Sequence, residues 1–207
     1  LRQACAEDFE KIPGKPIAYW ATSTELQIFA RCRTVNDSFD PRQGMATGDN
    51  ATFVRDWFEV SRNRSFYDCS SKTEAFASGK KWFPYNKGGP FRKWYGNTES
   101  VVDWSPAARS HYREDHVARI LDEQYWNLTG ICWSAVTTDK SSFRILASDE
   151  IANNAALSLF PRQPEYLLPL LGFLNSAAAE SLLKIFCTTL NFLVGDVVRL
   201  PFFELPK

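Results

Sequence analysis

A run of sixteen residues, 80–95, holds five basic side chains and six aromatic ones. No acidic residue occurs between Glu74 and Glu99. Basic side chains bind phosphates and aromatic faces stack on bases, so this mixture is typical of contact with a nucleic acid. The alternative is a structural loop whose rings pack inward, because Trp and Tyr are also common in ordinary cores.

Pro84, Gly88, Gly89 and Pro90 interrupt this run. Proline lacks the backbone N–H that a helix or a central strand uses, and glycine favours turns. The sequence therefore predicts neither a simple helix nor a central strand here, but a loop that bends at its glycines.

Residues 44–50 are a second candidate site, and they end in Gly48, Asp49 and Asn50. Glycine and asparagine tolerate left-handed backbone, which predicts a tight turn. Residues 51–60 favour a strand leaving this turn, although their apolar spacing also fits a helix. Backbone amides at such a turn can face phosphates, and the alternative is a purely structural hairpin turn.

Motifs for catalysis were sought in the sequence and are missing. It has no P-loop, no nucleophile elbow and no Glu-x-Lys, and no glycine-rich cofactor loop or Asn/Asp-Pro-Pro-aromatic tetrapeptide of an adenine methyltransferase. The five cysteines form no C-x-x-C, and His111 and His116 do not have a zinc spacing. We therefore predict a binding module with no catalytic residue and no metal ligand of its own.

The composition is that of an ordinary globular protein, with 44% hydrophobic residues and a formal net charge of zero over 207 residues. A zero net charge argues against a dedicated nucleic-acid binder, so a DNA interface must depend on local charge. The scattered cysteines predict a reduced, cytoplasmic setting, and no apolar run is long enough to predict a membrane partner. Because the first residue is Leu, we expect a piece of a longer protein.

The hydrophobic patterns predict an α+β fold. We expect a mixed, mainly antiparallel sheet with long connecting loops and a C-terminal helical pair, in one domain over residues 1–207. Its sub-regions would be a sheet-rich recognition part, 1–160, and closing helices with a return strand, 161–207. The expected helices are 1–12, 24–29, 105–124, 165–175 and 176–186; the expected strands are 17–20, 100–104, 131–134, 143–146 and 189–196; residues 39–43 and 137–140 are expected as loop and turn.

The central run is also part of a recognisable pattern. Residues 81–89, 91–97 and 101–104 closely resemble a signature of BREX-type (phage-defence) adenine-specific DNA methyltransferases, which are large, type IIG-like modification enzymes. Three further segments agree in order: 9–14 with 17–20, 44–55, and 171–176 with 189–196. The resemblance covers nearly the whole chain.

This resemblance implies a target-recognition domain, which reads DNA while a separate domain methylates adenine. S-adenosylmethionine would then serve the parent protein, and no cofactor is expected on this chain. The partners implied are double-stranded DNA, the protein's own N-terminal methyltransferase domain and other subunits of a restriction-modification or phage-defence system. The alternative is a protein-interaction or structural module that docks the catalytic domain or another defence subunit.

Within this interpretation, basic side chains of the run contact phosphates, Arg reads guanine, and Trp82, Tyr85, Trp94 and Tyr95 stack, wedge or pack. The turn at residues 44–50 approaches the DNA backbone. The predicted DNA-binding residues are Thr47, Gly48, Asn50, Lys80, Lys81, Tyr85, Asn86, Lys87, Gly88, Gly89, Arg92, Lys93, Trp94 and Tyr95.

Overall fold

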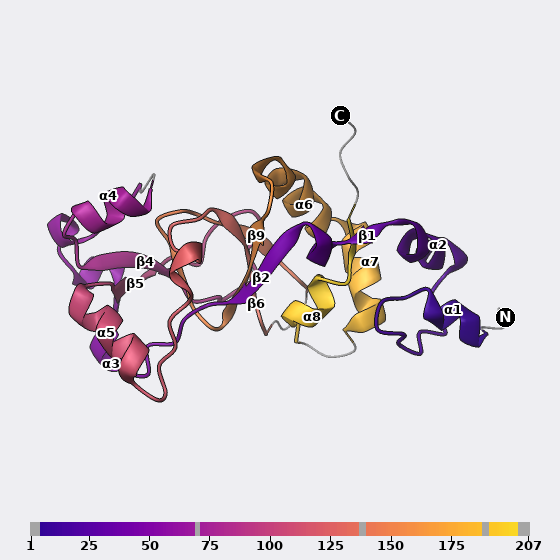
Figure 1. The fold of residues 1–207 in the computed structure, drawn as a ribbon, viewed down its shortest axis with the longest axis horizontal. Helices are drawn as coiled ribbons and strands as arrows, with labels where there is room; N and C mark the ends of the chain where they lie inside the picture. Colours follow the sequence, from indigo (N-terminus) through magenta and orange to yellow (C-terminus); the bar gives the residue numbers. More distant parts are fainter. Residues whose placement is uncertain (1–4, 69–70, 137–139, 188–190, 203–207) are drawn as a thin grey trace.

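The computed structural model describes residues 5–68, 71–136, 140–187 and 191–202, and they form an elongated α+β molecule (Figure 1). Two four-stranded sheets and one two-stranded sheet make up the β-structure of the described residues. Six of the seven strand pairings are antiparallel, and β4 with β8 is parallel. The α+β class and the mainly antiparallel sheet are confirmed.

One four-stranded sheet, which we call the central sheet, lies in the middle of the molecule and has the order β2-β9-β6-β7. Its strands are β2 (Phe39–Gln43), β9 (Ala156–Pro161), β6 (Gly130–Ser134) and β7 (Phe143–Leu146). The predicted pair 131–134 and 143–146 is confirmed as β6 and β7. The loop predicted at 39–43 is wrong: Pro41 pairs with Leu159, and β2 accommodates a proline because it is an edge strand.

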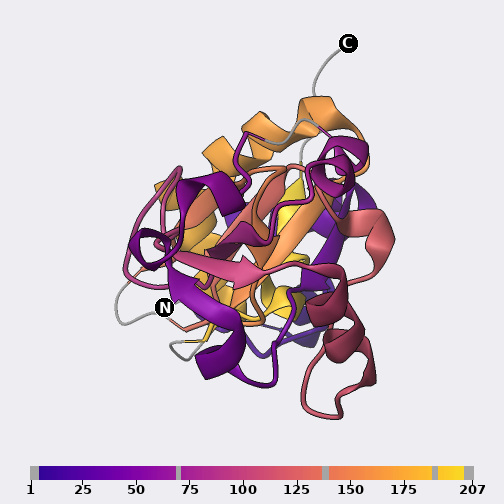
Figure 2. The same ribbon diagram turned by 90° about the vertical axis from the view of Figure 1, so that its left-hand side faces the viewer.

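The other four-stranded sheet, the distal sheet, has the order β3-β5-β4-β8 and occupies one end of the long axis, which faces the viewer in Figure 2. Its strands are β3 (Val54–Asp56), β5 (Ser100–Asp103), β4 (Trp82–Asn86) and β8 (Ile151–Ala152). The prediction that the aromatic run holds no central strand is wrong, because β4 pairs on both sides. Its Pro84 is tolerated since β8 pairs only with Tyr85 and Asn86.

Three short helices pack around the distal sheet: α3 (Asn50–Phe53), α4 (Lys72–Ala77) and α5 (Pro106–Glu114). The helix predicted at 105–124 is too long. Asp115 turns to extended backbone, and its carboxylate accepts hydrogen bonds from the backbone N–H groups of Val117 and Ala118, which ends α5. The short 3₁₀ turns are η1 (Val35–Asp37), η2 (Trp57–Glu59), η3 (Arg62–Arg64), η4 (Glu123–Tyr125) and η5 (Pro164–Tyr166).

The described N-terminal and C-terminal elements share one core with the central sheet. The N-terminal elements are α1 (Ala6–Glu10), α2 (Ser23–Arg31) and β1 (Arg33–Thr34); the C-terminal ones are α6 (Leu167–Leu174), α7 (Ala177–Phe186), α8 (Val194–Val197) and β10 (Pro201–Phe202). β1 pairs with β10, so the closing strand lies at 201–202 rather than at 189–196. Residues 194–197 are helical, and 188–190 lie outside the described residues.

The predicted C-terminal helical pair is confirmed, as α6 and α7. In the described residues no single helix is long and apolar enough to cross a membrane. Segments 164–174 and 177–186 would reach that length and hydropathy only together, and the angle between them is 82°. The strand predicted at 17–20 is instead a turn, in which Ala21 N–H donates to the carbonyl of Ala18. The turn predicted at 137–140 falls largely on residues that the structure does not describe.

The buried side chains form two main cores. One joins the central sheet to both chain termini, for example through Ile12, Phe39, Trp133 and Leu183. The other lies under the distal sheet and α5. The division into sub-regions 1–160 and 161–207 stays a prediction. Residues from both sub-regions contribute to the first core.

Candidate nucleic-acid interface

β4 divides the aromatic run into a buried middle and two accessible ends. All five of its residues are buried, and Tyr85 and Asn86 are both 0% exposed. The Tyr85 hydroxyl accepts a hydrogen bond from Asn153 Nδ2 at 2.6 Å, and Asn86 Nδ2 donates to Glu150 Oε2 at 3.0 Å. The prediction that Tyr85 and Asn86 contact DNA therefore needs correction, because both side chains serve the core.

Trp82 is also buried, at 8% exposure. Of the roles predicted for Trp82, which were to stack, wedge or pack, this burial agrees with packing. The alternative of inward-packing rings thus holds for the strand, because alternate side chains of a central strand face a core on each side.

The N-terminal end of β4 borders a hollow of about 250 Å³ between α4 and α5. Four basic side chains line it: Arg64, Lys80, Lys81 and Arg109. We call it the cationic hollow. The structure thus places the predicted residues Lys80 and Lys81 beside two cations that sequence reasoning missed, because Arg64 and Arg109 come from separate segments.

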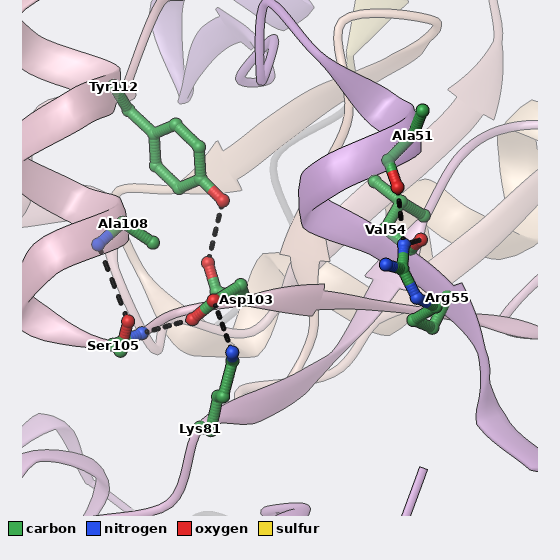
Figure 3. A network of polar contacts seen from close by, with 8 residues as sticks. All are labelled: Ala51, Val54, Arg55, Lys81, Asp103, Ser105, Ala108 and Tyr112. Atoms are coloured by element: carbon green, nitrogen blue, oxygen red, sulfur yellow. Dashed lines mark hydrogen bonds and ion pairs between the residues drawn. The ribbon is translucent and has the colours of Figure 1, made fainter. Parts of the chain in front are cut away.

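Polar contacts fix the wall of this hollow (Figure 3). Lys81 Nζ lies 3.0 Å from a carboxylate oxygen of Asp103, and Tyr112 donates its hydroxyl proton to the Asp103 carbonyl at 2.7 Å. The backbone N–H of Ser105 also donates to Asp103, and the Ser105 hydroxyl caps α5 by accepting from Ala108 N–H. Burial raises the pKa of Tyr112, so this hydroxyl stays a donor.

The C-terminal end of β4 leads into an exposed loop, residues 87–99, which we call the aromatic loop. Gly88 has φ +76°, and a Cβ there would lie 2.9 Å from the carbonyl oxygen of Ala155. Trp94 N–H donates to the Phe143 carbonyl at 2.9 Å, and Ile145 N–H donates to the Trp94 carbonyl at 2.9 Å. The loop is therefore held against the edge strand β7, and its bend at the glycines agrees with the sequence prediction.

The aromatic loop presents both rings and cations to solvent. Phe91, Trp94 and Tyr95 are 51%, 50% and 79% exposed. Arg92 forms an exposed ion pair with Glu99, at 2.6 Å, and Lys93 Nζ donates to the Asn175 carbonyl at 2.7 Å.

Among the predicted residues of this loop, the accessible ones are Lys87, Gly89, Arg92, Lys93, Trp94 and Tyr95, whereas Gly88 is buried. Lys87 and Arg92 are exposed, and so are the side chains of Trp94 and Tyr95. The loop thus exposes the two kinds of side chain on which the prediction depends, cations and aromatic rings, while phosphate binding and stacking stay predictions.

The turn at residues 44–50 is a third accessible feature. Gly48 has φ +76°, as predicted for a turn, and Asp49 caps α3 by accepting from Thr52 N–H. The Thr47 hydroxyl is buried and donates to Asn50 Oδ1 at 2.8 Å. Thr47, Gly48 and Asn50 line a polar hollow of about 230 Å³ with Asn153 and Asn154. Residues 51–60 begin as α3 and form a strand only at 54–56, so the predicted strand is too long.

A polar cluster is buried between the two sheets. Asn86 Nδ2 lies 3.3 Å from Cys132 Sγ as well as near Glu150, and Arg144 is 0% exposed. Burial raises the pKa of Glu150 to about 7 and that of Cys132 to about 12. Sequence reasoning missed this cluster, because its members lie on four separate segments.

The described residues contain no group of three or more His, Cys, Asp or Glu placed to hold a metal ion. No family model matches the chain. The adenine-specific methyltransferase PglX of Lacticaseibacillus casei (strain Zhang) is 38% identical over 205 residues, which cover 94% of this chain and 17% of PglX. The adenine-specific methyltransferase BrxX of Escherichia coli O9:H4 (strain HS) is 30% identical over 204 residues, which cover 97% of this chain and 16% of BrxX.

The chain is homologous to one segment of these methyltransferases. It spans about a sixth of the length of the curated relatives that it matches. The resemblance to adenine-specific methyltransferases that the sequence suggested is thereby confirmed.

Proposed function

We propose that this chain is the DNA-recognition module of an adenine-specific DNA methyltransferase of a phage-defence system. Its similarity to PglX and BrxX over nearly its whole length supports a place in such an enzyme. The observation that carries the recognition role is the aromatic loop, where Lys87, Arg92, Trp94 and Tyr95 stand accessible on a scaffold fixed to β7.

In this proposal the aromatic loop reads the DNA and other parts of the protein perform the chemistry. Arg92 is the candidate for a bidentate contact with guanine, because its planar guanidinium matches the guanine O6 and N7 acceptors. Its ion pair with Glu99 is exposed and weak, so DNA can displace it. Trp94 and Tyr95 offer ring faces for stacking against a base or sugar.

Methyl transfer would use S-adenosylmethionine bound elsewhere in the full-length protein, and the target adenine would leave the duplex to reach that site. The module would then set the register and choose the sequence. A cytoplasmic location belongs to the same proposal.

A graft tests the recognition role. We would exchange the segment equivalent to this chain between two relatives that methylate different DNA motifs, and then map the methylated adenines by sequencing. The methylated motif is expected to follow the grafted segment. If the motif instead stays with the recipient protein, the segment does not choose the sequence.

A second candidate function, protein docking, is favoured by one observation at the other end of the molecule. Ile17, Tyr19 and Trp20 are 75%, 70% and 47% exposed in the turn that follows α1. Exposed apolar side chains that stand together are typical of a protein interface. Replacing Tyr19 and Trp20 by Ser should weaken association with the rest of the methyltransferase in a pull-down of separately expressed parts, whereas an unchanged yield would reject docking through this turn.

A further inference from the structure

The cationic hollow is separate from the aromatic loop. Lys81 precedes β4 and Lys87 follows it, so six residue steps lie between them. At about 3.3 Å per residue in a strand, the two positions are roughly 20 Å apart. Substitutions at such a distance are expected to act independently, so the two features can be tested one at a time.

The charge of the hollow is unbalanced. Lys81 is paired with Asp103, but Lys80 Nζ donates to the carbonyl of Asn63, and Arg109 Nη1 donates to the carbonyl of Trp104. A carbonyl oxygen satisfies a donor without cancelling its charge. The described residues that line the hollow include four cations and no acid. Nearby, Asp103 pairs with Lys81 and the charge of Glu123 acts on Arg109, so the cations still outnumber the carboxylates.

Further features hold these cations close together. The guanidinium of Arg109 stacks on Phe76, with 4.6 Å from its central carbon to the ring centroid. Burial lowers the pKa of Arg109 and the charge of Arg113 nearby lowers it further, against a smaller opposing effect of Glu123. Like charges held together in a partly desolvated site cost free energy, and an anion that binds there recovers it.

We infer that the cationic hollow binds a phosphodiester group of the DNA backbone. This inference rests on the proposed function and adds to it a contact that is independent of sequence. The carbonyls of Asn63 and Trp104 and the ring of Phe76 fix the donors before DNA arrives, so little side-chain entropy is lost on binding. Arg64 is exposed at the mouth of the hollow and makes the outermost contact.

The test uses the full-length protein and duplex DNA with and without the methylated motif. Arg64→Glu removes one cation and adds one acid. The matched control is Arg31→Glu, the same change of charge on the exposed surface of α2 at the other end of the molecule (Figure 1). Fluorescence anisotropy would measure the dissociation constant from 50 to 200 mM salt, and circular dichroism would confirm folding.

For each lost phosphate contact, the slope of log K against log salt falls by about 0.9. The fourfold rise in salt weakens DNA binding by some factor in the wild type, and in Arg64→Glu this factor should be smaller by about 3.5-fold. Affinity should fall alike for both DNA sequences, and Lys80→Gln should show the same effect if Arg64→Glu does not fold.

The outcomes separate this inference from the proposed function. If the wild type binds DNA and Arg64→Glu behaves like Arg31→Glu, the hollow is not a phosphate site, while the recognition role stands. If Arg64→Glu changes only the preference between the two sequences, the hollow reads bases and the inference is wrong. If the wild-type protein binds neither DNA, both proposals are rejected.

Discussion

The carboxylate of Glu150 lies in the polar cluster between the two sheets, where it accepts a hydrogen bond from Asn86 Nδ2 at 3.0 Å. On its other side Glu150 lines a mostly apolar cavity with Trp104, Leu146 and Phe160. Burial raises its pKa from 4.5 to about 7. We therefore expect Glu150 to make its own contribution to the pH dependence of stability.

The direction follows from proton binding. Between pH 4.5 and about 7 the folded chain keeps the Glu150 proton while the unfolded chain releases it, so the folded state binds more protons. The contribution of Glu150 to stability is fully present below its unfolded pKa and is lost as the pH rises through its folded pKa. At 1.36 kcal/mol per pKa unit, the change from 4.5 to about 7 corresponds to roughly 3 kcal/mol.

Glu150→Gln is the informative change, because glutamine resembles the protonated acid and still accepts from Asn86. Urea unfolding at pH 5, 6, 7 and 8 should show a variant that is more stable than the wild type by only about 1 kcal/mol at pH 5 and by roughly 3 kcal/mol at pH 8. Glu114→Gln, at an exposed position on α5, is the control and should follow the wild type. If the difference in free energy of unfolding between the wild type and Glu150→Gln stays constant from pH 5 to 8, the reasoning is refuted.

Three further predictions concern single contacts. Gly44→Ala would place a Cβ 2.3 Å from the carbonyl oxygen of Ala152 and should lower the free energy of unfolding by about 1–3 kcal/mol in urea titrations; an unchanged value would show that the backbone can move apart there. Tyr85→Phe leaves the buried amide of Asn153 without its acceptor and should cost about 1–3 kcal/mol of stability; in the full-length protein it should leave DNA affinity unchanged at a temperature where the variant is folded, and a selective loss of affinity would contradict its core role. Tyr95→Ala should keep the thermal midpoint, because the side chain is 79% exposed, while DNA binding by the full-length protein weakens by about 1–3 kcal/mol if the ring stacks on a base; equal affinity would exclude stacking.

Local patterns allowed several elements to be predicted correctly. The short apolar runs of β6 and β7 and the break at Asn175-Ser176 between α6 and α7 depend on neighbours in sequence, so one chain was enough to find them. The errors arose where tertiary pairing overrode a local signal. Pro41 and Pro84 favoured loops, yet both lie in strands, because each falls where one side of the strand has no ladder partner.

The sequence by itself determined the α+β class, the resemblance to adenine-specific methyltransferases and the local concentration of cations and rings in residues 80–95. Only the tertiary structure decided which of these side chains are accessible. Packing against the faces of the distal sheet buries Trp82, Tyr85 and Asn86 of β4, whereas Lys80 and Arg92, beyond the ends of the strand, stay at the surface. The cationic hollow likewise depends on the tertiary structure. Residue types and spacing specify only local geometry, and the side chains of Arg64 and Arg109 approach Lys80 only once the distal sheet has formed.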